Sequence, residues 1–142
     1  MKRALLRFAG AEIGTNVRIC SSAKIIGSGR LSIGNNTFVG PLTFIHVSSS
    51  VIIGKNCDVS SNVTILNGSH EVDLEGDHIA GKGKSEDVLI GDGSWICTNA
   101  TILGGTKIGE KCLVAASSTT KGAYPSYSII KGCIAKPTPL TK

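Results

Sequence analysis

His46, His70 and His78 are the side chains in this sequence that best match the task of accepting a proton near neutral pH. A neutral imidazole can take the proton that a hydroxyl or amine loses as it attacks an acyl group. His70 opens the polar run His70-Glu71-Val72-Asp73, in which Glu71, Asp73 or a backbone carbonyl could orient the ring. His70 is therefore a candidate general base, and the alternative for a histidine taken alone is a polar loop residue. We expect His46 and His78 to be solvated, although either could line an acceptor pocket.

A metal site is the alternative use of the three histidines. A zinc centre of the γ-carbonic anhydrase type needs three histidines that converge across a subunit interface. His70 and His78 instead lie in or beside one short segment, which disfavours that arrangement. The cysteines form no C-x-x-C pair, so we expect no metal and no disulfide framework, only free thiols in a reducing compartment. They are Cys20, Cys57, Cys97, Cys112 and Cys133.

The elements that position these residues follow a six-residue repeat. One aliphatic residue every sixth position indicates short strands separated by corners, and three repeats close one triangular coil. Gly or Asn often follows the aliphatic residue and suits a tight corner. The sequence therefore predicts an all-β stack of about five to six coils. The aliphatic positions are Ile13, Ile19, Ile25, Ile33, Val39, Ile45, Ile53, Val59, Ile65, Ile90, Ile96, Ile102, Ile108 and Val114.

Composition agrees with a thin, repetitive core. The chain has 142 residues, of which 41% are hydrophobic but only 4% aromatic, and 18 are glycine. Small and β-branched side chains must therefore fill the interior. The length fits a single domain. Within residues 1–142 we expect an N-terminal cap at 1–12, coils at 13–70 and 88–120, a protruding polar loop at 71–87, and an extension at 121–142 that packs outside the coils.

The formal net charge of +5 suits a polyanionic ligand such as a nucleotide cofactor, a nucleic acid or an anionic lipid. Nucleic acid is disfavoured because aromatic residues are few and do not alternate with Lys or Arg. Arg7 interrupts the apolar run near the N-terminus, so we expect no signal peptide. No stretch approaches the ~20 apolar residues of a membrane span, and we expect a cytoplasmic protein without an integral membrane segment.

The repeat resembles that of the hexapeptide-repeat acyltransferases over roughly residues 13–119. Their [LIV]-G-x-x-x-x unit is similar to Ile13-Gly14, Ile33-Gly34, Ile53-Gly54, Ile90-Gly91 and Ile108-Gly109. The resemblance implies a left-handed parallel β-helix, a handedness that general rules for parallel strands would not predict. It further implies an acetyl-CoA donor, a homotrimer with sites between subunits, and a catalytic role for the histidine of a His-x-x-Asp signature, here His70.

The same resemblance implies the coenzyme site. The stretch from Ile90 to Cys97 is similar to the family's I-G-D-x-x-W-I-G element, with Cys97 where glycine is commoner. Trp95 precedes an aliphatic position, so it should point outward and line a covered groove. By similarity, Thr98 lies beside the thioester and small side chains flank the pantetheine arm. Two lysines would meet the phosphates. The residues concerned are Trp95, Thr98, Ala115, Ala116, Ser118, Lys121 and Lys136.

The acceptor is implied more loosely. The opening residues 5–14 and the closing Tyr124-Pro125 element resemble the branch that modifies surface polysaccharide or lipopolysaccharide. This similarity favours O-acetylation of a sugar or sugar nucleotide. N-acetylation of an amino sugar is the second enzymatic reading, and a non-catalytic β-helix or a carbonic-anhydrase-like protein is the alternative class.

Overall fold

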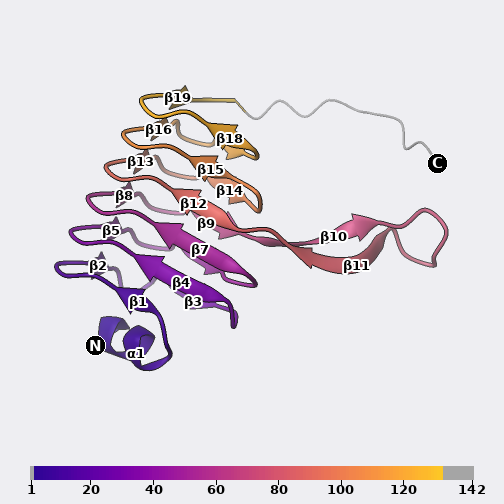
Figure 1. The fold of residues 1–142 in the computed structure, drawn as a ribbon, viewed down its shortest axis with the longest axis horizontal. Coiled ribbons are helices and arrows are strands. Elements are labelled where there is room, and N and C mark those ends of the chain that lie inside the picture. Colours follow the sequence, from indigo (N-terminus) through magenta and orange to yellow (C-terminus); the bar gives the residue numbers. More distant parts are fainter. Residues whose placement is uncertain (1, 133–142) are drawn as a thin grey trace.

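The computed structural model describes residues 2–132, which wind into the expected left-handed parallel β-helix of triangular coils (Figure 1). Three parallel sheets form its faces, and the two larger sheets have six strands each, so the stack has about six turns. Face A holds β1 (Glu12–Ile13), β4 (Arg30–Ile33), β7 (Ser50–Ile53), β12 (Val88–Ile90), β15 (Lys107–Ile108) and β18 (Ala123–Tyr124). Face B holds β2 (Arg18–Ile19), β5 (Phe38–Val39), β8 (Asp58–Val59), β13 (Trp95–Ile96), β16 (Leu113–Val114) and β19 (Ile129–Ile130). Face C holds β3 (Lys24–Ile26), β6 (Phe44–His46), β9 (Thr64–Leu66), β14 (Thr101–Leu103) and β17 (Thr119–Thr120).

The six-residue aliphatic positions form columns along the axis. On face A, Ile33 pairs with Ile53, Ile53 with Ile90, and Ile90 with Ile108. These side chains, like those at the equivalent positions of faces B and C, are buried, except that Ile19 and Ile25 of the first coil are only partly covered. Removing one such side chain from water contributes about 1.5–3 kcal/mol, so the repeat itself supplies the main stabilisation of the stack.

The corners use glycine and asparagine for different reasons. Asn16, Asn36 and Asn56 adopt positive φ angles of 52°, 58° and 55° at successive turns of the corner between faces A and B, and their side-chain amides form a ladder with N···O distances of 3.2 and 3.1 Å. Gly34 does not have positive φ. A Cβ atom there would lie 2.6 Å from the carbonyl carbon of Gly54. The glycines after the isoleucines are therefore required by the close approach of neighbouring coils.

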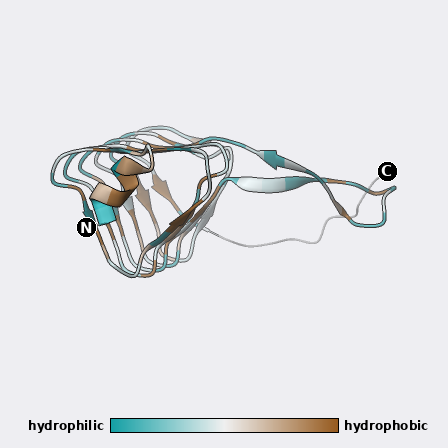
Figure 2. Ribbon diagram, turned by 90° about the horizontal axis from the view of Figure 1, so that it is seen from below, coloured by the Kyte–Doolittle hydropathy of each residue, from teal (hydrophilic) through white to brown (hydrophobic). Residues whose placement is uncertain are grey.

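Helix α1 (Lys2–Phe8) covers the N-terminal end of the stack (Figure 2). Its Lys2 ammonium donates to the carbonyl oxygens of Cys20, Ser21 and Ala23, and the Arg7 guanidinium donates to those of Ile13 and Gly14. The helix thus satisfies the exposed carbonyl edge of the first coil, as an N-terminal cap should. No helix within residues 2–132 is long and apolar enough to cross a bilayer.

The expected departure from the coil at residue 121 is corrected by the structure. Strands β18 and β19 continue faces A and B, with Tyr124 paired to Ile108 and Ile130 paired to Val114. The corner between faces C and A loses residues here, since only four positions separate the buried Thr120 from Tyr124. That shortening shifts the six-residue phase and conceals the continuation in the sequence.

The excursion is a two-stranded antiparallel hairpin, which we call the arm, residues 68–85 (Figures 1 and 2). Strand β10 (Gly68–Val72) pairs with β11 (Ala80–Ser85), and the ribbon projects from the corner between faces C and A. The sequence predicted a loop at 71–87; the structure has paired strands here, and the first of them begins at Gly68.

Candidate active site

The root of the arm is fixed by Asn67, a residue that sequence reasoning missed. Asn67 is only 1% exposed. Its Oδ1 atom accepts hydrogen bonds from the backbone N–H and the hydroxyl of Ser48 at 2.8 and 2.9 Å, and its Nδ2 atom donates to Ser49 Oγ and the Ser50 carbonyl oxygen at 3.0 and 3.2 Å. The returning strand is held as well, because the Glu86 N–H donates to the Asn67 carbonyl oxygen. The point at which the arm leaves the coil is thereby defined.

His70 lies on β10, three residues beyond Asn67. It is exposed, and it pairs in register with Gly83, which has no side chain to cover it. Within residues 2–132 no side chain is hydrogen-bonded to its ring. His46 lies beside the same root, since a Cβ atom on Gly68 would be 3.4 Å from His46 Cε1. The structure thus brings His46 to the root of the arm and leaves both nitrogens of His70 available to ligands or to another chain.

Glu71 and Asp73 differ in their surroundings. Asp73 Oδ1 accepts the backbone N–H groups of Glu75 and Gly76 at 3.0 and 2.9 Å, and these hydrogen bonds lower the pKa of its carboxyl group. Its Oδ1 atom is therefore engaged in the turn at the tip of the arm and not at His70. Glu71 is exposed on β10 next to His70, with the strand register shifted between His70 and Val72.

A hollow of about 90 Å³ lies at the root of the arm on the side of the later coils. Asn67, Ser69 and Lys84 line one part of it, and Leu103, Gly104 and Lys121 line another. Lys121 forms an ion pair with Glu86 at 3.6 Å, with both side chains substantially exposed. The predicted coenzyme residue Lys121 is therefore at the corner between faces C and A, beside the arm.

Five other predicted coenzyme residues, Trp95, Thr98, Ala115, Ala116 and Ser118, gather at or near the opposite edge of face C, at the corner between faces B and C. Trp95 is 50% exposed on face B, and its indole N–H donates to Ser60 Oγ at 3.1 Å. Thr98 is exposed at the corner, and its hydroxyl donates to the Ser61 carbonyl oxygen at 2.9 Å. One coil further on, Ala115 is half-buried, Ala116 is exposed, and Ser118 is buried with its Oγ accepting the Gly132 N–H.

Backbone amides line this corner. Within residues 2–132, the N–H groups of Ser61, Thr98 and Ala116 donate to no protein acceptor, and they occupy the same place in three successive coils. At the corner between faces A and B, in contrast, the equivalent amides are taken in every second coil. There the side chains of Asn35, Asp92 and Ser126 accept the N–H groups of Thr15, Lys55 and Glu110, so no unbroken row of free donors forms. Coils stack ~4.8 Å apart, so the three free donors form a row that an extended amide-containing ligand could follow. A sequence does not reveal which backbone N–H groups are free, so only the small residues beside these amides indicated the site in advance.

The candidate residues therefore divide between two edges of face C. His46, His70 and Lys121 lie at the edge next to face A, and Trp95, Thr98, Ala115, Ala116 and Ser118 lie at or near the edge next to face B. The strand and corners between them span on the order of 15 Å. One chain does not bring the two groups together. Lys136 lies outside the described residues.

No group of three His, Cys, Asp or Glu side chains within residues 2–132 is arranged to hold a metal ion. The cysteines in this part of the chain, Cys20, Cys57, Cys97 and Cys112, are free thiols. Cys57 faces the interior, where burial raises the pKa of its thiol. Cys97 is half-buried at the end of β13, and partial burial raises its pKa as well.

Comparison with known families places the repeat in both halves of the chain. Residues 87–122 match the bacterial transferase hexapeptide model, and residues 30–67 match the model for the hexapeptide repeat of succinyl-transferase. The two matches lie on either side of the arm. They correspond to the coils before and after the excursion.

Named relatives share the repeat over most of the chain. WcaF of Escherichia coli, named for acetyl transfer in colanic acid biosynthesis, is 29% identical over 128 residues, which are 90% of this chain and 68% of WcaF. WbbJ of the same organism, named as an O-acetyl transferase of lipopolysaccharide biosynthesis, is 31% identical over 103 residues, which are 66% of this chain and 53% of WbbJ. The hexapeptide-repeat acetyltransferase VCA0836 of Vibrio cholerae has the same fold, with a TM-score of 0.78 and 24% identity over 88% of this chain and 70% of that chain. A second structure of VCA0836 contains acetyl coenzyme A, with a TM-score of 0.68 and 21% identity over 88% of this chain and 68% of that chain.

Proposed function

Because this chain belongs to the hexapeptide-repeat acyltransferase family, we propose that it is an acetyl-CoA-dependent O-acetyltransferase whose acceptor is a sugar or sugar nucleotide. The names of WcaF and WbbJ support an acceptor from surface polysaccharide or lipopolysaccharide biosynthesis. The acetyl-CoA complex of VCA0836 supports the donor. Free thiols and a requirement for acetyl-CoA are consistent with a cytoplasmic location.

His70 is the proposed general base. As the acceptor hydroxyl attacks the thioester carbonyl carbon, the imidazole takes the hydroxyl proton and a tetrahedral intermediate forms. Its collapse breaks the C–S bond, and the imidazolium returns the proton to the leaving sulfur, so that coenzyme A departs as the thiol. The observation that carries this proposal is the exposed ring of His70 at the fixed root of the arm, opposite Gly83 and free of hydrogen bonds to side chains of residues 2–132. Such a ring can accept a proton from a bound hydroxyl without first breaking an internal contact.

The row of free amides at Ser61, Thr98 and Ala116 is the proposed path of the pantetheine arm. Its amide carbonyl groups would accept hydrogen bonds from these donors, and a backbone N–H near Thr98 would stabilise the oxyanion of the intermediate. Small side chains at Ala115 and Ala116 leave the backbone accessible. The sequence beyond residue 92 carries six Lys and one Glu, an excess of positive charge suited to the coenzyme phosphates. Lys121 and Lys136 belong to this set.

Two copies of the chain are needed to complete this site. His70 and the amide row lie at opposite edges of face C, so the base of one copy would meet the coenzyme on the next. Three prisms packed around a three-fold axis give three equivalent interfaces of this kind. We therefore propose a homotrimer with one active site at each interface.

The test measures thiol release from acetyl-CoA with a panel of neutral sugars, sugar nucleotides and amino sugars, and identifies the product by mass spectrometry. The native chain should acetylate a hydroxyl, and the His70→Ala variant should be slower by about 10²–10⁴-fold. His78→Ala is the matched control, because His78 is another exposed histidine of the excursion, and it should keep the native rate.

An unchanged rate in His70→Ala would remove His70 from the mechanism. Acetylation of an amino group only would replace the proposed reaction by N-acetylation. Stoichiometric zinc in the purified protein, together with no thiol release for any acceptor, would favour the carbonic-anhydrase-like alternative.

A further inference from the structure

The outer side of α1 is apolar and uncovered. Phe8 is 94% exposed and Leu5 is 62% exposed, and they lie three positions apart, on neighbouring parts of the helix surface. Leu6 packs against the core, and Lys2 and Arg7 hold the carbonyl edge of the first coil. Figure 2 shows the helix, which contains both hydrophobic and hydrophilic residues, lying across the end of the stack. The cap of the coil therefore needs Lys2, Leu6 and Arg7, but not the two large exposed side chains.

The same end of the molecule is strongly basic. Residues 1–57 contain seven Lys or Arg residues and one acidic residue, whereas residues 58–142 contain eight basic and nine acidic residues. The acidic residue of the first group, Glu12, is paired with Arg30 at 2.9 Å. The net positive charge of the chain therefore comes from the coils nearest α1.

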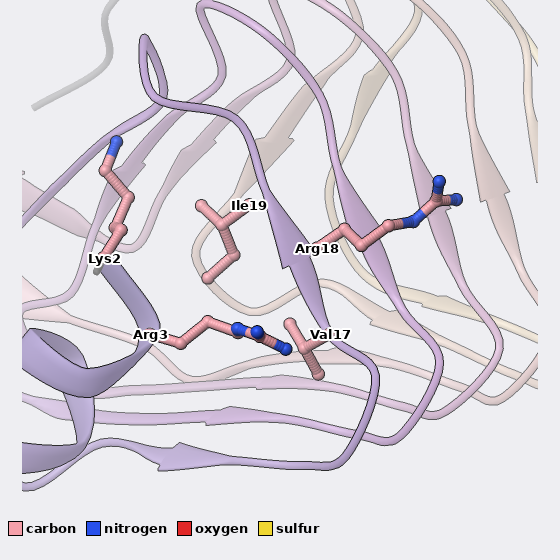
Figure 3. Close-up of a pocket in the computed structure, with 5 residues that line it drawn as sticks. All are labelled: Lys2, Arg3, Val17, Arg18 and Ile19. Atoms are coloured by element: carbon pink, nitrogen blue, oxygen red, sulfur yellow. The ribbon is translucent and has the colours of Figure 1, made fainter.

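Arg3 of α1 and Arg18 of β2 have no acidic partner in the part of the chain that the structure describes. They line two adjoining hollows of about 420 and 270 Å³ between the helix and the first coils. In Figure 3, Arg3 extends from α1 toward Val17, and Arg18 extends from β2. The Arg18 guanidinium lies over the ring of Phe38, 5.1 Å from its centroid, and the residue remains exposed.

We propose that the N-terminal end of the prism docks on an anionic phospholipid surface. Leu5 and Phe8 would enter the boundary between headgroups and acyl chains, and Arg3 and Arg18 would bind lipid phosphates. Apolar side chains flanked by unpaired cations match this occupant. A second copy does not match it, because contact between two N-terminal ends would bring like charges together. The C-terminal coils of another copy are also basic, with four Lys and one Glu in residues 107–132.

The experiment is co-sedimentation of the full chain with vesicles, and its readout does not depend on acetyl transfer. Binding to phosphatidylcholine vesicles that contain phosphatidylglycerol should exceed binding to pure phosphatidylcholine by about tenfold or more, and added salt should weaken it. The Leu5→Ser/Phe8→Ser variant should lose about tenfold in binding to the anionic vesicles. Arg3→Gln/Arg18→Gln should lose a similar factor and show a smaller salt dependence.

Matched controls come from the other end of the stack. Tyr127→Ser removes another exposed aromatic side chain, and Lys107→Gln/Lys111→Gln removes the same charge; both should bind vesicles like the native chain. Equal binding to neutral and anionic vesicles, or no binding to either, would overturn the proposal. If Leu5→Ser/Phe8→Ser binds like the native chain, the basic end is a general polyanion surface and the lipid assignment is wrong. All α1 variants should keep the native acetyl-transfer rate toward a water-soluble acceptor, which separates this proposal from the proposed function.

Discussion

Replacing Asn67 by alanine should destabilise the root of the arm and the whole stack. The change removes four hydrogen bonds of a buried side chain and leaves the Ser48 N–H and the Ser50 carbonyl without that partner. Each hydrogen bond contributes about 1 kcal/mol net, and unsatisfied buried groups add to the loss. The free energy of unfolding should therefore fall by about 2–4 kcal/mol. For a chain of this length that corresponds to a Tm lower by about 10 °C.

Urea titration and calorimetry measure this change, with Asn35→Ala as the matched control. Asn35 accepts one hydrogen bond from the Thr15 N–H on the exposed corner, so its loss should lower the free energy of unfolding by less than about 1 kcal/mol. Hydrogen exchange should accelerate most at the root of the arm in Asn67→Ala. If both variants lose the same small amount of stability, Asn67 does not fix the root of the arm and the reasoning fails.

Three further predictions concern pH, thiols and assembly. The hydrogen bonds from the Glu75 and Gly76 N–H groups lower the pKa of Asp73 below its ordinary value of 3.8, so the turn that they hold is stable above pH 3.8 and is lost as the pH falls through the lowered pKa. NMR should therefore show faster hydrogen exchange of these two amides at that low pH while the coils stay intact. Unchanged exchange rates would contradict this prediction. Burial raises the pKa of the Cys57 thiol, so a thiol reagent at neutral pH should modify Cys57 at a rate lower by about tenfold or more than that of a thiol in the unfolded chain. Mass spectrometry of labelled peptides measures this rate, and rapid labelling of Cys57 would contradict the prediction. Light scattering of the purified chain should give the mass of a trimer, since both edges of face C contribute to the proposed site, and a monomer with acetyltransferase activity would refute the shared site.

The coil was predictable because the aliphatic side chains that produce it recur at regular intervals in the sequence. Ile33, Ile53 and Ile90 recur in phase and face the axis, and only aliphatic side chains can fill a column whose neighbours lie one coil apart. The six-residue spacing also ends at a definite point. At Thr120 the corner shortens, and the anchors that follow, Tyr124 and Ile130, no longer fall on the expected positions.

The candidate site was predictable only in part. The polar run at His70 and the small residues near Thr98 and Ala116 could be found from residue type and from similarity. Asn67 could not, because its partners are serines 17–19 positions earlier and their approach depends on the stacking of two coils. The sequence did not predict that the arm is a hairpin, since β11 consists of Ala, Gly, Lys and Ser without an alternation of apolar and polar side chains.

Mixed oligomers test the central claim that His70 of one copy acts on a thioester held at the amide row of another. His70→Ala removes the base, and Ala116→Trp places a bulky side chain over the row, so each variant alone should be inactive. Co-expressed with different tags and purified through both, they form trimers in which one interface of the three has an intact base and an intact row, so activity should return to about one third of the native value. Mixed trimers that stay inactive would contradict a shared site.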